Sequence, residues 1–139
     1  MFTVRVGVRG YELDVLGHLN QAVYLQYAEH ARWELLRTAG VTPAKLQVSR
    51  TGPVVLETTI RYLAELNAGD EVDVSCALEW GAGKTFRMAQ EIRRVDGTLA
   101  ADVTAVAGIL DLDRRRMLAA PADHFRSLAD DPALLNLPT

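Results

Sequence analysis

The first residues of the chain alternate between apolar and polar positions. Valine occupies positions 4, 6 and 8, and arginine or glycine occupies positions 5, 7 and 9. A period of two residues is typical of a strand that buries one face. We therefore expect a strand over residues 3–10, followed by a turn at residues 14–17.

From about Gln21 to Thr38 the apolar positions take a helical spacing. Residues suited to a core recur every three or four positions there, namely Tyr24, Tyr27 or Ala28, Ala31 and Leu35. Asn20 suits the N-cap of this helix, and Gly40 suits its end. Further apolar side chains widen the apolar face of this helix. We therefore expect most of the helix surface to be buried.

The rest of the chain predicts a short helix and then a series of strands. Thr42 and Pro43 suit the N-cap and first position of a helix that ends near Val48, and residues 51–53 predict a break. A weaker helix is predicted from Pro121 to about Leu128. Alternating or branched apolar residues predict four strands, over residues 55–62, 71–80, 85–95 and 99–110.

These elements predict a single α+β domain. One long central helix would be wrapped by an antiparallel sheet of about five strands, counting the first. A chain of 139 residues can build one sizeable core. We expect this domain to span residues 1–129, and residues 130–139 to form a loosely held tail. Such a sheet has exposed edges, which predicts a homodimer that extends it.

Composition and charge exclude several classes of function. The hydrophobic fraction is 49% and the charged fraction 24%, as in ordinary globular proteins. The formal net charge of −3 argues against nucleic acid or a membrane surface as a partner. A single cysteine, Cys76, excludes an intrachain disulfide. Since the sequence has no membrane-spanning run and residues 1–6 lack a signal-peptide pattern, we expect a cytoplasmic protein.

Residues 11–20 carry most of the chemical information. They read Tyr-Glu-Leu-Asp-Val-Leu-Gly-His-Leu-Asn, which places Asp14, Gly17 and His18 directly before the long helix. A carboxylate beside the amino end of a helix combines a base or nucleophile with a dipole that binds an oxyanion. Hydrolysis of an activated acyl group needs this combination.

The chain resembles hot-dog-fold acyl thioesterases of the 4-hydroxybenzoyl-CoA thioesterase family. The resemblance covers nearly the whole chain, from Val4 to about Pro121. Weaker matching segments lie at residues 60–62, 68–72 and 96–97. The segments that carry most of it are Tyr11-Glu12-Leu13-Asp14, Gly17-His18-Leu19-Asn20, Tyr24 with Tyr27, and Glu29 with Ala31-Arg32.

The resemblance implies a role for each of several residues. Asp14 would attack the thioester carbonyl or activate water. The oxyanion would bind at the amino end of the helix, near Gly17, His18, Asn20 and Gln21. The acyl pocket would be walled by Tyr24, Tyr27 and Glu29. Basic residues would contact the coenzyme A or carrier-protein arm, namely Arg61, Lys84 and Arg87.

The resemblance also implies the partners. The substrate would be an acyl thioester of coenzyme A or of an acyl carrier protein, and the products a free carboxylic acid and a thiol. The protein would form a homodimer or homotetramer with active sites at the dimer interface. Neither a metal nor another cofactor is implied.

Several alternatives stay open at this point. A hot-dog hydratase or dehydratase would need a histidine paired with a carboxylate, and His18 with Asp14 or Glu29 is the candidate pair. A non-catalytic acyl-binding module could use the same fold. Glu29 is the second candidate for the catalytic carboxylate, and its structural alternative is an ion pair with Arg32 or with a partner chain. Cys76 is expected to be a core residue.

Overall fold

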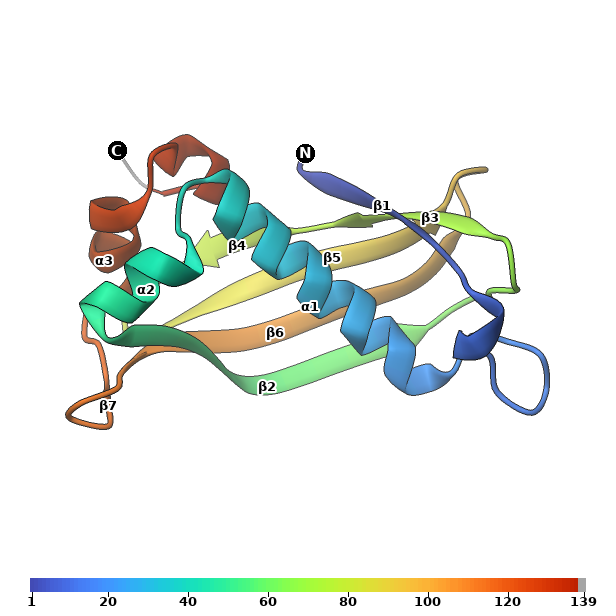
Figure 1. The fold of residues 1–139 in the computed structure, drawn as a ribbon, viewed down its shortest axis with the longest axis horizontal. Coiled ribbons are helices and arrows are strands. Elements are labelled where there is room, and N and C mark those ends of the chain that lie inside the picture. Colours follow the sequence, from blue (N-terminus) through green and yellow to red (C-terminus); the bar gives the residue numbers. More distant parts are fainter. Residues whose placement is uncertain (138–139) are drawn as a thin grey trace.

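The computed structural model describes residues 1–137 as an antiparallel sheet curled around one long helix (Figure 1). The helices are α1 (Gln21–Thr38), α2 (Pro43–Ser49) and α3 (Pro121–Leu128), with 3-10 turns η1 (Gly10–Glu12) and η2 (Pro132–Leu135). The strands are β1 (Thr3–Gly7), β2 (Thr51–Tyr62), β3 (Glu71–Ser75), β4 (Ala77–Trp80), β5 (Thr85–Arg94), β6 (Leu99–Asp111) and β7 (Arg116–Met117).

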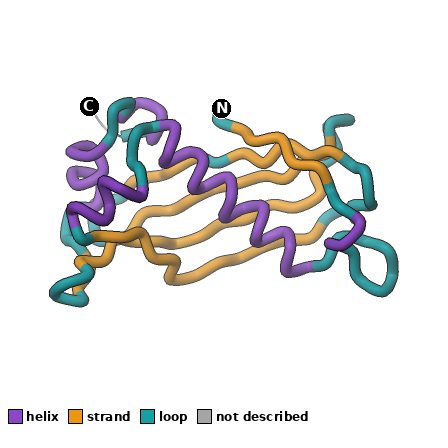
Figure 2. Tube along the Cα trace, in the orientation of Figure 1, coloured by secondary structure: helices purple, strands orange, loops and turns teal. Residues whose placement is uncertain are grey.

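The sheet has the order β1-β3-β5-β6-β2, and every pairing is antiparallel. Two short strands extend this path, since β4 pairs with β5 and β7 pairs with β6. The predicted strand over residues 71–80 is therefore interrupted at Cys76. Figure 2 shows α1 lying across one face of the sheet. This arrangement confirms the expected hot-dog fold.

Helix α1 buries one face only. Its buried residues are Tyr24, Tyr27, Ala28, Ala31, Leu35 and Leu36, which confirms the predicted spacing. The expectation that most of the helix surface is buried was wrong, because the sheet covers one side. Leu25 is 38% exposed and Trp33 is 40% exposed.

Strand β2 forms an open edge of the sheet. It begins at Thr51 and contains Pro53, where the sequence predicted a break. Proline is tolerated there because an edge strand does not need every N–H donor. The register shifts between Val55 and Glu57, so Leu56 sits in a bulge. Val55 is 50% exposed and Leu56 is 55% exposed.

The carboxy-terminal segment packs against one end of the sheet. Phe125 is fully buried, and its ring lies 5.8 Å from that of Trp80. The Trp80 indole N–H donates to the Leu135 carbonyl at 2.8 Å, and the Leu135 side chain is also fully buried. Residues 130–137 are therefore held against the core, unlike the loose tail that we expected. Residues 138–139 lie outside the described part of the chain.

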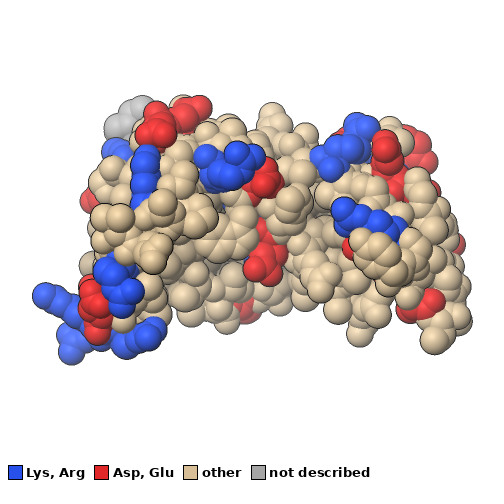
Figure 3. Space-filling model, in the orientation of Figure 1, with Lys and Arg blue, Asp and Glu red and all other residues tan. Residues whose placement is uncertain are grey.

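The turn between β6 and β7 projects from the same end of the molecule. The Asp111 carboxylate accepts hydrogen bonds from the backbone N–H groups of Asp113 and Arg114, each at 3.0 Å. Arg115 adopts a left-handed conformation with φ of 55°. Figure 3 shows basic side chains gathered at this end. We call Arg114, Arg115 and Arg116, all of them exposed, the arginine turn.

We predict that Leu135→Ala destabilises the domain by about 2–5 kcal/mol, because it leaves a cavity where a fully buried side chain packed. Urea unfolding would measure this loss. Leu134→Ala, at a partly buried position of the same turn, is the matched control and should cost clearly less. Equal, small losses for both variants would contradict the packing described for this segment.

Candidate active site

Asp14 lies in a short loop between η1 and α1 and helps to hold that loop. Its Oδ1 accepts hydrogen bonds from the backbone N–H groups of Leu16, at 2.9 Å, and His18, at 3.2 Å. Its own N–H donates to the His18 carbonyl at 2.7 Å. Gly17 has a φ of 81°, which allows the tight turn. Within residues 1–137 no hydrogen bond reaches Oδ2, so this oxygen of an exposed side chain is available to water or substrate.

The loop leads directly into the amino end of α1. The Asn20 side chain accepts a hydrogen bond from the Ala22 N–H at 2.9 Å, which confirms it as the N-cap. The Asn20 N–H donates to the Glu12 carbonyl at 2.9 Å. The N–H groups of Gly17 and His18 are occupied by Asp14. Among the backbone donors predicted for the oxyanion, the Gln21 N–H alone has no acceptor within residues 1–137.

A shallow depression of about 310 Å³ joins these groups. The Tyr62 hydroxyl donates to the Gln21 carbonyl at 3.0 Å. The rings of Tyr24 and Tyr62 meet edge to face, with centroids 5.1 Å apart. Asp14, Gln21 and Tyr24 thus all line the same depression. The residues that line the depression are Asp14, His18, Leu19, Gln21, Tyr24, Tyr62, Leu63, Ala64 and Glu65.

The ring of His18 pairs with Glu65 rather than with Asp14 or Glu29. Its Nε2 lies 3.0 Å from a Glu65 carboxylate oxygen. Neither of the two predicted pairs, His18 with Asp14 or His18 with Glu29, is therefore formed within residues 1–137. Glu65 and Tyr62 were not predicted as site residues, because both reach the site through the path of β2 and its following loop.

Tyr27 lies away from this depression, toward β1. Its hydroxyl donates to the Glu12 carboxylate at 2.5 Å. Burial, and then the neighbouring Glu12, raise the pKa of Tyr27. Burial alone would raise the pKa of Glu12, but the hydrogen bonds from Tyr27 and from the Arg9 N–H outweigh it and lower that pKa. Tyr27 thus holds η1 against α1.

Glu29 lies in a different groove, between α1 and β2. This α1–β2 groove has a volume of about 200 Å³. Arg32 also lines it and donates from Nε to Gln90 at 2.7 Å, while burial lowers the pKa of Arg32. The Arg32 Nη2 atom is buried and has no hydrogen-bond partner within the described chain. The other lining residues are Trp33, Leu36, Pro53, Val54, Val55, Met88 and Ala107.

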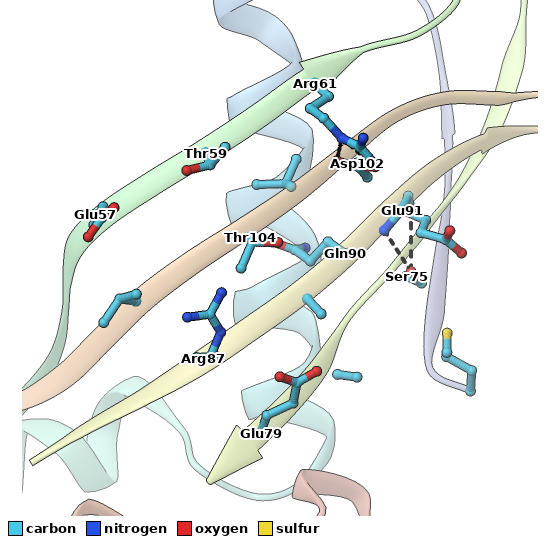
Figure 4. A pocket seen from close by; sticks show the side chains of 15 residues that line it. Glu57, Thr59, Arg61, Ser75, Glu79, Arg87, Gln90, Glu91, Asp102 and Thr104 are labelled. Carbon is cyan, nitrogen blue, oxygen red and sulfur yellow. Dashed lines mark hydrogen bonds and ion pairs between the residues drawn. The ribbon is translucent and has the colours of Figure 1, made fainter. Parts of the chain in front are cut away.

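The three predicted basic contacts do not lie beside Asp14 in the same chain. Arg61 and Arg87 line a hollow of about 680 Å³ on the sheet face opposite α1 (Figure 4). The Arg61 Nε donates to both oxygens of Asp102 at 3.1 Å, and this pairing lowers the pKa of Asp102. Lys84 lies in the exposed turn between β4 and β5. A single chain thus does not place a basic residue of this set beside Asp14.

Two further titratable residues, Cys76 and His124, do not line the depression at Asp14. Cys76 is buried, and this burial raises the pKa of its thiol to about 12. The His124 Nε2 lies 2.9 Å from the Thr51 hydroxyl. Within residues 1–137, no group of three or more His, Cys, Asp or Glu side chains is placed to hold a metal ion. None of the described helices is long and apolar enough to cross a membrane.

Comparison with known proteins identifies a family. Residues 8–129 match the thioesterase-like superfamily. The long-chain acyl-CoA thioesterase FadM of Escherichia coli is 29% identical over 116 residues, which cover 83% of this chain and 87% of that protein. The chloroplastic acyl-acyl carrier protein thioesterase ATL3 of Arabidopsis thaliana is 35% identical over 75 residues, 54% of this chain. That match spans only 40% of the plant protein.

Solved structures agree with this family assignment. The YbaW protein of Escherichia coli superimposes with a TM-score of 0.83 and 25% sequence identity. The superposition covers 99% of this chain and 100% of that one. The long helix and the curled sheet are therefore shared over the whole length of both chains.

We predict that Tyr27→Phe lowers the free energy of unfolding by about 1.5–3 kcal/mol at pH 7, because it removes a hydrogen bond to a charged carboxylate. The pKa of Glu12 is lowered in the folded protein, so this stability is present above the unfolded pKa of about 4.3 and is lost as the pH falls through the folded pKa.

Urea titrations at pH 7 and near pH 3 would test this prediction. The difference between wild type and Tyr27→Phe should shrink at the lower pH. Tyr11→Phe, at a position that is 84% exposed, serves as the control. A loss that does not change with pH would show that Glu12 is not the partner that matters.

Proposed function

Because this chain belongs to the thioesterase-like superfamily, we propose that it hydrolyses acyl thioesters to a free carboxylic acid and a thiol. One observation carries the proposal. The exposed carboxylate of Asp14 shares a depression with the first residue of α1, whose N–H group is unoccupied within the described chain. The proposed attacking group and the proposed oxyanion donor thus line the same depression. The narrower assignment to the 4-hydroxybenzoyl-CoA thioesterase family stays a prediction.

In the proposed mechanism, the thioester carbonyl lies between Asp14 and Gln21. Two backbone N–H groups fix Oδ1 of Asp14, which leaves Oδ2 to attack the carbonyl carbon or to take a proton from an attacking water. The Gln21 N–H and the dipole of α1 would stabilise the negative charge on the carbonyl oxygen. Collapse of the tetrahedral intermediate then expels the thiolate. If water attacked, the thiolate takes the proton that Asp14 removed from that water, and the free acid is released directly. If Asp14 attacked, a mixed anhydride with Asp14 remains, and water hydrolyses it to release the acid while the proton of that water passes to the thiolate.

The proposed function also bears on which carrier holds the acyl group and on how copies of the chain assemble. FadM is named for acyl-CoA, and ATL3 for an acyl carrier protein. We propose that this protein takes an acyl group from one of these carriers, without a cofactor. We further propose a homodimer or homotetramer in the cytoplasm, in which a partner chain completes the site, because the depression at Asp14 is open in a single chain. The acyl-pocket roles predicted for Tyr27 and Glu29 stay proposals, since in a single chain both side chains lie away from the depression at Asp14.

We predict that Asp14→Ala and Asp14→Asn lower kcat for thioester hydrolysis at least about 100-fold, which is about 2.7 kcal/mol of barrier. The measurement is free-thiol release from a panel of acyl-CoAs and acyl carrier proteins. Asp14→Asn keeps an oxygen for the two loop N–H groups, so it separates chemistry from loop structure. Full activity of a folded Asp14→Asn variant would rule out the carboxylate as the reacting group.

We predict that Gln21→Pro lowers kcat by about 10²–10³-fold while the protein stays folded. Proline removes the N–H group that would stabilise the oxyanion. It is tolerated at the first position of a helix, and Asn20, with φ of −59° and ψ of 135°, has a conformation that suits the residue before proline.

Gln21→Ala is the matched control for this test. It removes the same side chain but keeps the N–H group, so its kcat should stay close to that of the wild type. If both variants lose activity equally, the side chain rather than the backbone donor matters at this position.

A further inference from the structure

Glu12, just before the Asp14 loop, is bonded to the long helix at two points. Its backbone carbonyl accepts a hydrogen bond from the Asn20 N–H at 2.9 Å, at the N-cap. Its side-chain Oε1 accepts another from the Tyr27 hydroxyl at 2.5 Å. Tyr27 lies six residues after Gln21, the first residue of α1, which is about 9 Å along the helix axis. Two contacts this far apart fix the orientation of Glu12 relative to α1, whereas one contact alone would act as a hinge.

The same carboxylate also holds the short turn η1. Oε1 of Glu12 accepts a hydrogen bond from the Arg9 N–H at 3.0 Å, and Oε2 accepts one from the Arg9 Nη1 at 3.4 Å. The Glu12 side chain is 10% exposed, and Tyr27 is 4% exposed. A carboxylate that is mostly buried and accepts three hydrogen bonds has little freedom to move, because any lost bond would leave a charged oxygen without a partner. Glu12 therefore joins η1 and α1 into one unit.

This unit carries both of the groups that the proposed reaction uses. Asp14 follows Glu12 by two residues, in a loop that the pairing of Leu13 with Leu19 closes. Gln21, the proposed oxyanion donor, is the first residue of α1. A shift of η1 against α1 would therefore move the Asp14 carboxylate relative to the Gln21 N–H. A displacement of about 1 Å between reacting groups can lower a rate by about 100-fold.

We propose that Glu12 and Tyr27 are positioning residues, whose hydrogen bond sets the place of the Asp14 carboxylate relative to the Gln21 N–H and thereby the rate of thioester hydrolysis. This inference rests on the proposed function for the roles of Asp14 and Gln21. It gives Tyr27 a role different from the one predicted for it in the wall of the acyl pocket. A wall residue contacts the acyl group, whereas a positioning residue acts through Glu12, so the two roles have different kinetic effects.

The kinetics of Tyr27→Phe separate these two roles. This variant keeps the ring and removes only the hydroxyl that donates to Glu12. In the thiol-release panel we expect kcat to fall at least about 10-fold, KM to change less than about 3-fold, and the loss of kcat to be the same for every acyl group. A change in KM that depends on the acyl group, with kcat unchanged, would assign Tyr27 to the pocket wall and overturn the proposal.

Two variants of Glu12 separate the hydrogen bonds from the charge. Oε1 accepts from both Tyr27 and the Arg9 N–H, so Glu12→Gln can keep an acceptor for both and removes only the charge. Glu12→Ala removes the acceptor itself. We expect Glu12→Gln to keep kcat within about 3-fold of the wild type and Glu12→Ala to lose at least about 10-fold. Adding Tyr27→Phe to Glu12→Ala should lower kcat no further, because the contact is already absent. Equal losses in the two Glu12 variants, or additive losses in the double variant, would overturn the proposal.

Leu135→Ala is the matched control for lost stability. It removes a fully buried side chain from the carboxy-terminal segment, which lies at the end of the molecule opposite the Asp14 loop (Figure 1). All rates are expressed per folded protein, with the folded fraction taken from urea unfolding. We expect Leu135→Ala to keep the kcat of the wild type. If it loses kcat as Tyr27→Phe does, reduced stability rather than a displaced loop explains the loss, and the proposal is overturned.

Amide hydrogen exchange tests the positioning without requiring hydrolysis. The N–H groups of His18 and Asn20 are bonded to Asp14 and Glu12 within the loop. We expect Tyr27→Phe to speed exchange at both groups at least about 10-fold, and Leu135→Ala to leave both close to the wild type. Unchanged exchange in Tyr27→Phe would overturn the proposal. A wild type that cleaves no thioester would contradict the proposed function, whereas the exchange rates would still decide whether Tyr27 holds the loop.

Discussion

The structure of the site depends on the two hydrogen bonds that Oδ1 of Asp14 accepts from its own loop. They fix the chain between Leu16 and His18, and so set where the loop ends and α1 begins. One carboxylate thus positions both the proposed reacting oxygen and the helix end that would face the carbonyl. The position of Asp14 is set by a seven-residue segment, closed by the pairing of Leu13 with Leu19, and the proposed attack would depend on this segment.

The surroundings of α1 show how the remaining backbone donors are used. The N–H groups of Gly17, His18, Asn20 and Ala22 all have acceptors in the loop, in η1 or in the cap. Satisfied donors stabilise the loop but cannot bind an oxyanion. The Gln21 N–H has no acceptor within residues 1–137, and the Gln21 carbonyl accepts a hydrogen bond from Tyr62, which ties the start of the helix to the end of β2. The proposed donor is therefore fixed by the Asn20 cap and by the hydrogen bond from Tyr62 to the Gln21 carbonyl.

Much of the fold could be predicted from the sequence because it depends on local periodicity. The alternating valines before Gly7 predicted β1. The helical spacing from Tyr24 to Leu35 predicted α1. The errors arose where tertiary context decides. Pro53 is accepted in β2 because that strand is an edge. Residues 130–137 pack because Trp80 and Phe125 provide a surface for Leu135, which no local pattern reveals.

The site could be predicted only in part, for a related physical reason. Asp14 and Gln21 lie within seven residues, so a short motif indicates both, whereas Tyr62 and Glu65 reach them through β2 and the loop that follows it. The basic residues show the limit most clearly. Arg61 and Arg87 point to the sheet face opposite α1, and Lys84 lies at the end of the sheet away from Asp14. Residue type alone indicated phosphate contacts, but the position of a charge relative to the reacting group depends on strand direction and on how copies of the chain assemble.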